Sequence, residues 1–408
     1  MKEFFRVVSW PEAVGHRGSF PVVGGETVSL AEVDGRVLVE DIVAPKDLPG
    51  FRRSTMDGFA VRAGSTFGVS IGSPALFDVI GSVAMGCGTD LVVRACQAAR
   101  ILTGGMLPRG ADAVVMVEHT EALDESTIEV SKSVAPGQNV IEANEDASAG
   151  QVVLLAGTRV RPQEAGLLAA MGRTVVSVRR RPVVAILSTG DEVVPPAVEL
   201  EPGQIRDVNS TTLAAMVERV GGIPQNLGIV GDDFDRLLAK CRLAVETADV
   251  LLISGGSSVG SRDLTIEVIS QLARAEVLFH GVAIKPGKPT ILAKVGSRAV
   301  WGLPGHVASA MVVFRVLVQP MLRHISGQKQ GTVGAHLSAK LSRNVPSVHG
   351  RVDFVRVRLE KRNAGFVAVP VPGRSGLLKS LVQADGLVEI ERDSEGLDDG
   401  SEVVVQLF

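Results

Sequence analysis

The stretch Pro182-Val-Val-Ala-Ile-Leu-Ser-Thr-Gly-Asp-Glu192 is an apolar run that ends in small hydroxyl, glycine and acidic residues. A continuous apolar run of this length is typical of a strand buried on both faces. Similar runs recur at Val250–Ile253 and Ala299–Leu303, each followed by a glycine-containing segment. Helical patterns lie between and after these runs, at Thr211–Val220, Phe234–Glu246, Leu264–Leu272 and from about Val307. This alternation predicts a parallel α/β sheet with helices on both faces.

The segments around this α/β unit, which we place at residues 181–327, have other patterns. Residues 41–135 contain short Val-rich runs separated by Gly and Pro, which predicts a β-rich domain. In the tail, apolar and charged residues alternate from Val355 to Glu360, which predicts a further β domain. A helix is predicted over Pro162–Met171, with a proline in its first turn. The chain of 408 residues is long enough for several such domains.

The composition excludes several classes of protein. Lys and Arg number 42 against 45 Asp and Glu, so the strongly basic surface of a nucleic-acid-binding protein is absent. With no tyrosine and 2 tryptophans, the chain also lacks an aromatic platform for single strands. The 3 cysteines form no CxxC motif, which favours a cytoplasmic location over a disulfide framework. No stretch has the pattern of a signal peptide or a membrane span, so we expect no membrane association.

Three loops are expected to meet at one edge of the predicted sheet, because ligands bind outside the carboxyl ends of parallel strands. They are Ser188–Glu192, Ser254–Gly260 and Pro304–His306. The candidate substrate-binding residues in these loops are Ser188, Thr189, Gly190, Asp191, Ser254, Gly255, Gly256, Ser257, Ser258, Gly260, Pro304, Gly305 and His306. In the second loop, glycines allow successive backbone N–H groups to face an anion ahead of a helix. A glycine-rich turn without a ligand is the alternative.

The segment Lys285-Pro-Gly-Lys-Pro289 is a second candidate for anion binding. Its prolines restrict the backbone and its glycine allows a tight turn, so both lysines are held on a stiff segment. This arrangement suits a phosphate or another oxyanion. A solvated turn is the alternative, because most lysines are simply exposed.

Carboxylates also lie on the same predicted edge of the sheet, so an anion could bind there only together with a cation. Asp191, Glu192 and Asp263 would repel a phosphate unless a divalent cation lay between them. Mg²⁺ accepts one or two carboxylates together with substrate phosphates, so the combination predicts metal-bridged phosphate chemistry. Helix capping is the alternative for Asp263, which precedes Leu264, and for Asp232.

Two turns in the β-rich domain, at Ser54–Ala60 and Thr103–Pro108, have little chemical signature of their own. Local physical chemistry predicts only that the chain turns there, and a structural role is the simpler interpretation. Their importance rests on a resemblance.

Six motifs, in this order, resemble those of the molybdopterin molybdenumtransferase family, which includes bacterial MoeA and the E domain of gephyrin. They are Leu48–Arg62, Thr103–Met116, Ser188–Glu192, Ser254–Gly260, Lys285–Pro289 and Gly302–Gly305. The resemblance extends over essentially the whole chain. It implies an elongated region formed by residues 1–40 and 136–180, an inserted β-rich domain at 41–135, a pterin-binding α/β domain at 181–327 and a β-barrel-like domain at 328–408.

The resemblance also implies an activity. Members of this family insert metal from molybdate into adenylylated molybdopterin, require Mg²⁺, and release AMP with the molybdenum cofactor. They are homodimers whose cleft lies between the α/β domain of one subunit and elements of the other. Transient contacts with other proteins of cofactor synthesis are also expected.

Site residues follow from the matched motifs. The catalytic positions implied are Asp57, Thr103, Asp146, Glu192, Asp232, Asp263, Lys285 and Lys288. Glu192 and Asp263 are the implied Mg²⁺ ligands. The serine-glycine loop would hold the pterin phosphate and the basic residues would hold molybdate. Looser matches in the last domain are Arg356 and Ser375.

The chain departs from the family pattern at several positions. His306-Val307 stands where the family has Asn-Pro, and Gly281 stands where a basic residue is frequent. The segment Val140–Glu145 lacks the usual arginines. These differences bear on oxyanion affinity and on the choice between molybdate and tungstate.

Two alternative functions remain. Molybdopterin adenylyltransferases share the α/β domain, but the Asp57-Gly58 motif and the C-terminal β domain favour metal insertion. A non-catalytic scaffold of the same fold is the other alternative, although the chain contains no long linker.

Overall fold

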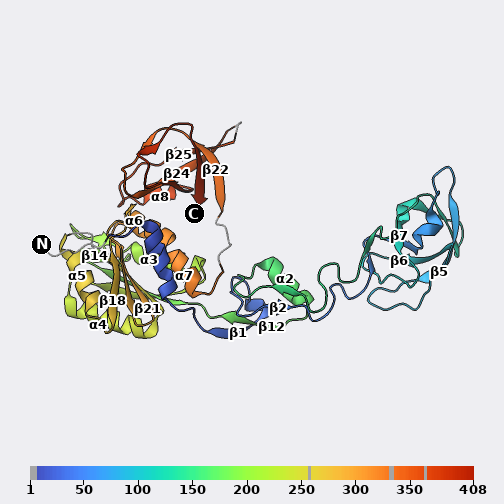
Figure 1. Ribbon diagram of the computed structural model, residues 1–408, viewed down its shortest axis with the longest axis horizontal. Helices are drawn as coiled ribbons and strands as arrows, with labels where there is room; N and C mark the ends of the chain where they lie inside the picture. The colour runs from blue at the N-terminus through green and yellow to red at the C-terminus, as the bar shows by residue number, and fades with distance from the viewer. Residues whose placement is uncertain (1–6, 256–258, 330–334, 363–364) are drawn as a thin grey trace.

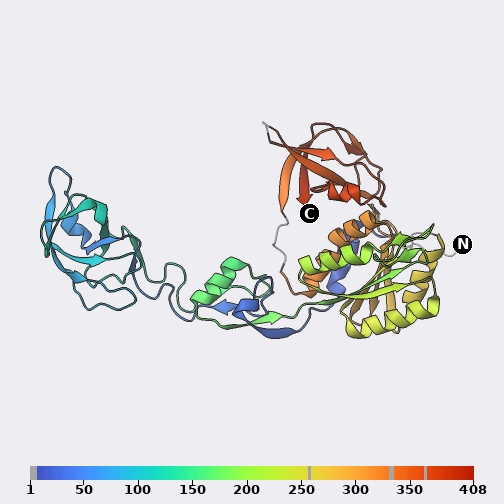
Figure 2. The same ribbon diagram turned by 180° about the vertical axis from the view of Figure 1, so that it is seen from behind.

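The computed structural model describes residues 7–255, 259–329, 335–362 and 365–408, with the backbone alone over 259–263. The molecule is extended (Figure 1). The α/β domain and the C-terminal β domain lie at one end, the inserted β domain lies at the other, and a thin segment joins them, as Figure 2 shows from behind. Within the described ranges, no helix combines the length and the apolar composition that a membrane crossing requires.

The α/β domain is built on a six-stranded sheet with the order β16-β13-β17-β21-β20-β18. The strands span Ile223–Val230 (β16), Val183–Thr189 (β13), Val250–Gly255 (β17), Arg298–Pro304 (β21), Ile291–Val295 (β20) and Ala275–His280 (β18). The first four are parallel, as predicted for the three apolar runs that became β13, β17 and β21. Strand β16 and the antiparallel edge formed by β20 and β18 were not predicted.

Helices cover both faces of this sheet, as expected for continuous apolar strands. Val184 and Ile186 of β13 belong to the core beneath α3, α6 and α7, whereas Ala185 and Leu187 face the core beneath α4 and α5. The helices span Asn209–Arg219 (α3), Phe234–Thr247 (α4), Val259–Ser270 (α5), Val307–Val313 (α6) and Gln319–Ile325 (α7), with a π-helical turn at Phe314–Val318 between the last two. Successive residues of a buried strand therefore stabilise two separate cores.

The N-terminal helix α1 (Trp10–Gly15) packs on the α/β domain. Ala13 and Phe20 belong to its larger core, and Val8 forms a parallel bridge with Val282. Residues 8–23 therefore lie outside the elongated region, to which the resemblance assigned residues 1–40. The physical reason is that their apolar side chains complete a core formed by residues far away in the sequence.

The elongated region combines two segments that flank the inserted domain in sequence. Strand β1 (Gly25–Ser29) pairs antiparallel with β12 (Val175–Arg179), and β2 (Ile42–Val43) pairs with β11 (Val152–Leu154). Helix α2 (Pro162–Ala170) covers these strands, close to its predicted bounds. The short pair β3 (Arg53–Ser54) and β10 (Val140–Ile141) leads into the inserted domain.

The inserted domain is β-rich, as predicted, with a six-stranded sheet in the order β7-β4-β6-β5-β9-β8. Its strands span Gly58–Val61 (β4), Ala75–Ser82 (β5), Gln97–Ile101 (β6), Ala113–Met116 (β7), Thr120–Ala122 (β8) and Thr127–Val130 (β9). Two small cores lie on the two faces of this sheet.

The C-terminal domain is a closed barrel in which β24, β25, β22, β28 and β26 pair in a ring. These strands span Val352–Arg362 (β24), Gly365–Pro370 (β25), His336–Leu341 (β22), Glu402–Leu407 (β28) and Gly386–Ile390 (β26), with β23 (Val345–Pro346) paired to β27 (Gly396–Leu397) and a short helix α8 (Lys379–Val382). Strand β19 (Ile284–Lys285) of the α/β domain pairs with β24 and so joins the two domains.

Candidate active site

The described residues of the three loops expected at one sheet edge do meet there. In the parallel register, Ser188 lies opposite Ser254, and Ser254 lies opposite Leu303. Gly255 follows at the end of β17, where a Cβ atom would lie 1.9 Å from the Thr189 methyl group. A glycine is needed at this position because the neighbouring strand leaves no room for a side chain.

A polar cavity of about 150 Å³ opens at this edge, between the three loops and the short strands β14 (Val193–Val194) and β15 (Ile205–Arg206). It contains seven of the predicted site residues: Ser188, Thr189, Glu192, Ser254, Gly255, Gly305 and His306. Pro304 is the last residue of β21 and is not part of the cavity lining in the described residues. We refer to this space as the sheet-edge cavity.

A buried hydrogen-bond network fixes the walls of the sheet-edge cavity. The Asn209 Nδ2 group donates to Ser254 Oγ at 2.6 Å and to the Gly305 carbonyl at 2.7 Å. The Gly305 carbonyl can only accept a hydrogen bond, so the side-chain atom of Asn209 that contacts it must be the amide nitrogen. The side-chain oxygen of Asn209 therefore points away from this carbonyl. Asn209 Oδ1 is buried and has no hydrogen-bond partner among the described residues. The site thus retains a buried acceptor.

A second part of the network supports the other strand. Ser188 Oγ lies 2.9 Å from Ser210 Oγ, which donates to Asp207 Oδ2 at 2.6 Å. All three residues are buried, so their polar atoms are held in fixed positions. The strand-end serine is therefore already oriented by its neighbours.

Three carboxylates gather beside this cavity. The Asp232 backbone N–H donates to Asp191 Oδ1 at 2.9 Å, and Thr189 Oγ1 lies 3.4 Å from Asp232 Oδ1. Burial, followed by the charges of Asp191 and Glu192, raises the pKa of Asp232. Asp233, whose side chain accepts from the Arg236 backbone N–H, caps α4 instead. The capping alternative for Asp232 is therefore wrong.

Such mutually repelling carboxylates suit a shared cation. In the part of the chain with described side chains, no three His, Cys, Asp or Glu residues are arranged to hold a metal ion. Glu192 is exposed at the cavity, whereas the side chain of Asp263 lies outside the described residues. Mg²⁺ bound by one or two carboxylates and by substrate phosphates fits this donor set better than a cage of protein ligands alone.

The remaining residues of the glycine-rich loop are described only in part. Gly256, Ser257 and Ser258 lie outside the described residues, and only the backbone of Gly260 is described, within α5. Helix α5 begins at Val259, so Asp263 lies inside the helix. The alternative that Asp263 caps this helix is therefore wrong.

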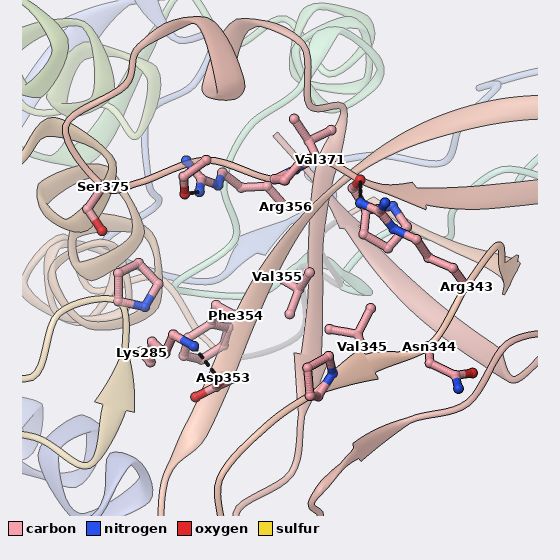
Figure 3. A pocket seen from close by; sticks show the side chains of 15 residues that line it. Lys285, Arg343, Asn344, Val345, Asp353, Phe354, Val355, Arg356, Val371 and Ser375 are labelled. Atoms are coloured by element: carbon pink, nitrogen blue, oxygen red, sulfur yellow. Dashed lines mark hydrogen bonds and ion pairs between the residues drawn. The ribbon is translucent and has the colours of Figure 1, made fainter.

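A second, basic cavity of about 520 Å³ lies between the α/β domain and the barrel (Figure 3). Lys285, Arg356 and Ser375 line it, and Figure 3 shows their side chains around the same space. Lys285 Nζ lies 3.5 Å from Asp353 Oδ2. Lys288 does not line this cavity in the described residues and is exposed elsewhere on the turn. Of the two lysines in this motif, Lys285 alone lines the basic cavity in the described residues.

Arg356 is held in place by the barrel. Its Nη1 group donates to Ser380 Oγ at 2.6 Å, and its Nη2 group donates to the Gly373 carbonyl. Burial lowers the pKa of Arg356. A guanidinium group remains charged even so, so it offers a fixed positive charge to an anion in the cavity.

The two cavities adjoin each other through the start of α6. The Ala308 backbone N–H donates to the Ser375 carbonyl at 3.0 Å. A Cβ atom on Gly376 would lie 3.4 Å from His306 Cδ2, so the barrel loop touches this histidine. His306 lines the sheet-edge cavity and Ser375 lines the basic cavity, which makes them neighbouring parts of one surface.

The inserted-domain residues form a separate constellation. Thr103 donates to Asp57 Oδ1 from its backbone N at 2.7 Å and from its hydroxyl at 2.8 Å. These two hydrogen bonds lower the pKa of Asp57. Asp146 is exposed near the entrance to this domain, and its backbone N–H donates to the Leu48 carbonyl. Figure 1 shows this domain at the opposite end of the molecule from the α/β domain, to which the sheet-edge cavity belongs.

Three family models match successive parts of the chain. They describe the MoeA N-terminal region (domain I and II) at residues 8–172, a probable molybdopterin binding domain at 185–324 and the MoeA C-terminal region (domain IV) at 338–408. The molybdopterin molybdenumtransferase of Bacillus subtilis is 35% identical over 391 residues, covering 94% of this chain and 90% of that protein. The chain belongs to the MoeA family.

Other members support the same assignment. The molybdopterin molybdenumtransferase of Haemophilus influenzae is 34% identical over 94% of both chains. A crystal structure of the MoeA protein from Pyrococcus horikoshii superposes with a TM-score of 0.84 at 32% identity, covering 99% of this chain and 100% of that one. Another crystal structure of a MoeA protein, also from Pyrococcus horikoshii, superposes with a TM-score of 0.78 at 40% identity, covering 98% of this chain and 99% of that one. The predicted resemblance is confirmed.

Sequence reasoning missed part of the site in this MoeA family chain. Asp207, Asn209 and Ser210 belong to none of the predicted loops or family motifs. Their partners Ser254 and Gly305 are 45 and 96 residues from Asn209. The available signal was the three polar residues Asp207, Asn209 and Ser210 close to the start of an amphipathic helix.

Proposed function

We propose that this chain inserts molybdenum from molybdate into adenylylated molybdopterin, releasing AMP and the molybdenum cofactor. As a member of the MoeA family, it is a molybdopterin molybdenumtransferase, an enzyme of molybdenum cofactor biosynthesis. The observation that supports the finer reaction best is the contact of His306, which lines the sheet-edge cavity, with Gly376, the neighbour of Ser375 in the basic cavity. Adjoining sites for two reactants would supply the proximity that a transfer reaction needs.

The sheet-edge cavity is the proposed site of the nucleotide-linked pterin. The Asn209 Oδ1 atom would accept a hydrogen bond from a ligand N–H group, because it is buried without a partner among the described residues. Ser188 and Ser254, fixed at the strand ends, would orient polar groups of the same ligand. Such a rigid polar network binds one orientation of a substrate in preference to others.

The basic cavity is the proposed site of molybdate. Arg356 presents a fixed guanidinium, and Lys285 could leave its ion pair with Asp353 because its side chain is 58% exposed. A dianionic oxyanion would compete with a single carboxylate for that ammonium group. Tungstate would bind in the same way, because it is also a tetrahedral dianion.

The carboxylate group beside the sheet-edge cavity is the proposed Mg²⁺ site. Glu192 would hold the ion together with Asp263 or Asp232 and the substrate phosphates. When bound, Mg²⁺ would neutralise phosphate charge and polarise the phosphorus–oxygen bonds to AMP. The protein's own part is to place and orient the two reactants.

Asp57 and Thr103 would act from a second subunit. The lowered pKa of Asp57 keeps its carboxylate charged, and the Thr103 hydroxyl orients it. Because the inserted domain lies at the opposite end of the molecule from the α/β domain and the barrel, we propose a homodimer in which each inserted domain completes the partner's site. We also propose that the enzyme works in the cytoplasm.

The test uses purified protein with adenylylated molybdopterin, molybdate and Mg²⁺. Asp57→Asn and Asp263→Asn are expected to fold normally but to stop the coupled release of AMP and formation of metal-bound cofactor. Unchanged AMP release in both variants would contradict these roles. Consumption of ATP with molybdopterin by the wild type would instead identify an adenylyltransferase. Cofactor formation at low molybdate without this protein would identify a scaffold.

A further inference from the structure

A cleft lined by arginines lies where the elongated region meets the α/β domain, away from both cavities described above. Five of its 12 lining residues are arginines and none is acidic. We call it the arginine cleft, and its arginines are Arg36, Arg159, Arg179, Arg180 and Arg181.

Only part of this positive charge is balanced. Arg36 forms an ion pair with Glu26, and Arg180 forms one with Asp249 at 2.6 Å. Asp249 is also bound by Arg298 at 2.6 Å, so its single charge serves two arginines. In the described part of the chain, three of the cleft arginines form no ion pair: Arg159, Arg179 and Arg181. The cleft therefore carries an excess of positive charge.

A buried donor in the cleft also lacks a partner. Arg36 is 8% exposed, and its Nε atom has no hydrogen-bond partner among the described residues. Its Nη2 group is held by Glu26 and by the Arg179 carbonyl, so the guanidinium cannot turn freely to satisfy Nε elsewhere. A buried donor without an acceptor is unfavourable, so Arg36 adds to the unbalanced positive character of the cleft.

A further arginine, Arg323, adds positive charge close to the cleft. The Nε atom of Arg323 is likewise buried without a partner in the described residues. Burial, followed by the charge of Arg159, lowers the pKa of Arg323. These arginines therefore repel each other in a setting that water screens poorly.

The position of the cleft links two domains. Gly35 and Arg36 come from the elongated region, whereas Gly221 and Ser326 come from the α/β domain. A Cβ atom on Gly221 would lie 3.8 Å from the Gly35 carbonyl, so the two backbones approach closely here. A group bound in the cleft would contact both sides of this junction.

We propose that the arginine cleft binds a tetrahedral oxyanion of double charge, such as inorganic phosphate or molybdate, and thereby stiffens the junction. Arginine suits this ligand because its planar fork donates two parallel hydrogen bonds to an oxyanion. The enclosed part of the cleft is only about 10 Å³, enough for one water-sized group. The anion would therefore sit at the mouth, where Arg181 is exposed.

The test measures binding to the full-length protein by calorimetry at low ionic strength, with inorganic phosphate and with molybdate in separate titrations. We expect one phosphate per chain in the arginine cleft, besides any phosphate that occupies the basic cavity. Arg159→Gln combined with Arg181→Gln should weaken phosphate binding by at least about tenfold, because it removes two charged donors. The matched control Arg94→Gln, in the inserted domain, should bind as the wild type does.

Lys285→Gln separates this proposal from the proposed function, because that variant alters the basic cavity and should keep its phosphate binding at the cleft. If the double variant fails to fold, Arg181→Gln alone is used in its place and should also bind phosphate more weakly. Phosphate should in addition raise the unfolding midpoint of the wild type. Molybdate binding that persists in Lys285→Gln and is lost in the double variant would identify molybdate as a natural occupant. No saturable phosphate or molybdate binding outside the Lys285 cavity, or equal binding by the double variant, would overturn the proposal.

Discussion

The amide of Asn209 connects two loops of the sheet-edge cavity, because its nitrogen donates to Ser254 and to the Gly305 carbonyl. We expect Asn209→Asp to destabilise the protein by about 1–3 kcal/mol, since a carboxylate would face a carbonyl oxygen with no proton between them. The KM for adenylylated molybdopterin should also rise. Urea unfolding and steady-state kinetics measure the two effects.

Asn226→Asp is the matched control for this change. Asn226 is an exposed residue of β16 whose side-chain oxygen accepts from the Gly228 backbone N–H at 2.8 Å, and an aspartate keeps that acceptor. Stability and KM should stay close to the wild type. Equal effects of the two substitutions would remove the special role of Asn209.

The pair Asp57 and Thr103 makes a prediction about pH. Two hydrogen bonds from Thr103 lower the pKa of Asp57, so its carboxylate stays charged to lower pH than usual. Thr103→Val removes the hydroxyl donor, and the pKa of Asp57 should rise toward its ordinary value. The acidic limb of the activity profile should then move to higher pH, which a pH series of AMP release would reveal.

The inserted domain offers a close control for that experiment. Ser126 donates to Asp124 Oδ1 from its backbone N at 2.7 Å and from its hydroxyl at 2.9 Å, and it lowers the pKa of Asp124 in the same way. Ser126→Ala should leave the activity profile unchanged. A profile that shifts equally in both variants would indicate a general effect on the domain.

At this scale, residues directly after strands could be predicted from the sequence. Ser188 and Ser254 follow apolar runs, and the parallel register brings them together. Asn209 could not be predicted in the same way, because its partners lie on other strands and loops. A contact between distant segments leaves no local pattern in the sequence.

Among the elements, the junction of β13 and β17 is the tightest part of the site. Gly255→Ala would bring a Cβ atom to 1.9 Å from the Thr189 methyl group. We expect a loss of about 1–3 kcal/mol in the free energy of unfolding, as is usual for overpacking. Adding Thr189→Ser should recover most of it, because that change removes the methyl group.

Gly166→Ala in α2 is the contrasting substitution. No atom lies within 4 Å of the added Cβ there, and the glycine is helical and exposed. Stability should increase by about 0.5–1 kcal/mol. If Gly255→Ala were as well tolerated as Gly166→Ala, β13 and β17 could not be packed as closely at the site as described.

Helix starts show how far local patterns reach. Helix α4 begins at Phe234 as predicted, although Asp233 rather than Asp232 caps it. Helix α5 begins at Val259, before the predicted start at Leu264. The periodicity of apolar residues predicts that a helix exists, whereas its first turn depends on side-chain contacts.

For the whole molecule, the contact between the barrel and the α/β domain should control molybdate binding. Arg315, in the π-helical turn, donates to the Leu407 carbonyl, and its guanidinium lies 5.7 Å from the Phe408 ring centre. Arg315→Met should loosen this contact and raise the KM for molybdate several-fold, with little change for the pterin. Arg362→Met, on an exposed part of the barrel, should leave both KM values unchanged.

The proposed exchange of inserted domains makes a second prediction at this scale. Mixed dimers of Asp57→Asn and Lys285→Gln subunits should regain about half of the wild-type activity per dimer. One composite site then carries both substitutions and the other carries none. Each variant alone should be inactive, and mixtures without any recovery would place both residues in a site within a single subunit.

Some large-scale features of the fold could be predicted from local sequence patterns and others could not. The α/β alternation followed from the runs at Val183–Thr189 and Val250–Gly255, because buried parallel strands are continuously apolar. Closure of the barrel through β24 and β26, and the docking of Phe20 on a distant core, could not follow from local patterns. Both depend on contacts between segments far apart along the chain.

The central claim is that the sheet-edge cavity and the basic cavity hold the two reactants of one reaction. The most direct measurement is a crystal structure with tungstate and adenylylated molybdopterin, in which anomalous scattering locates the metal. We expect tungsten between Lys285, Arg356 and Ser375, with the pterin nucleotide against Asn209 and Ser254. Tungsten or pterin bound on unrelated surfaces, with both cavities filled only by water, would contradict the account.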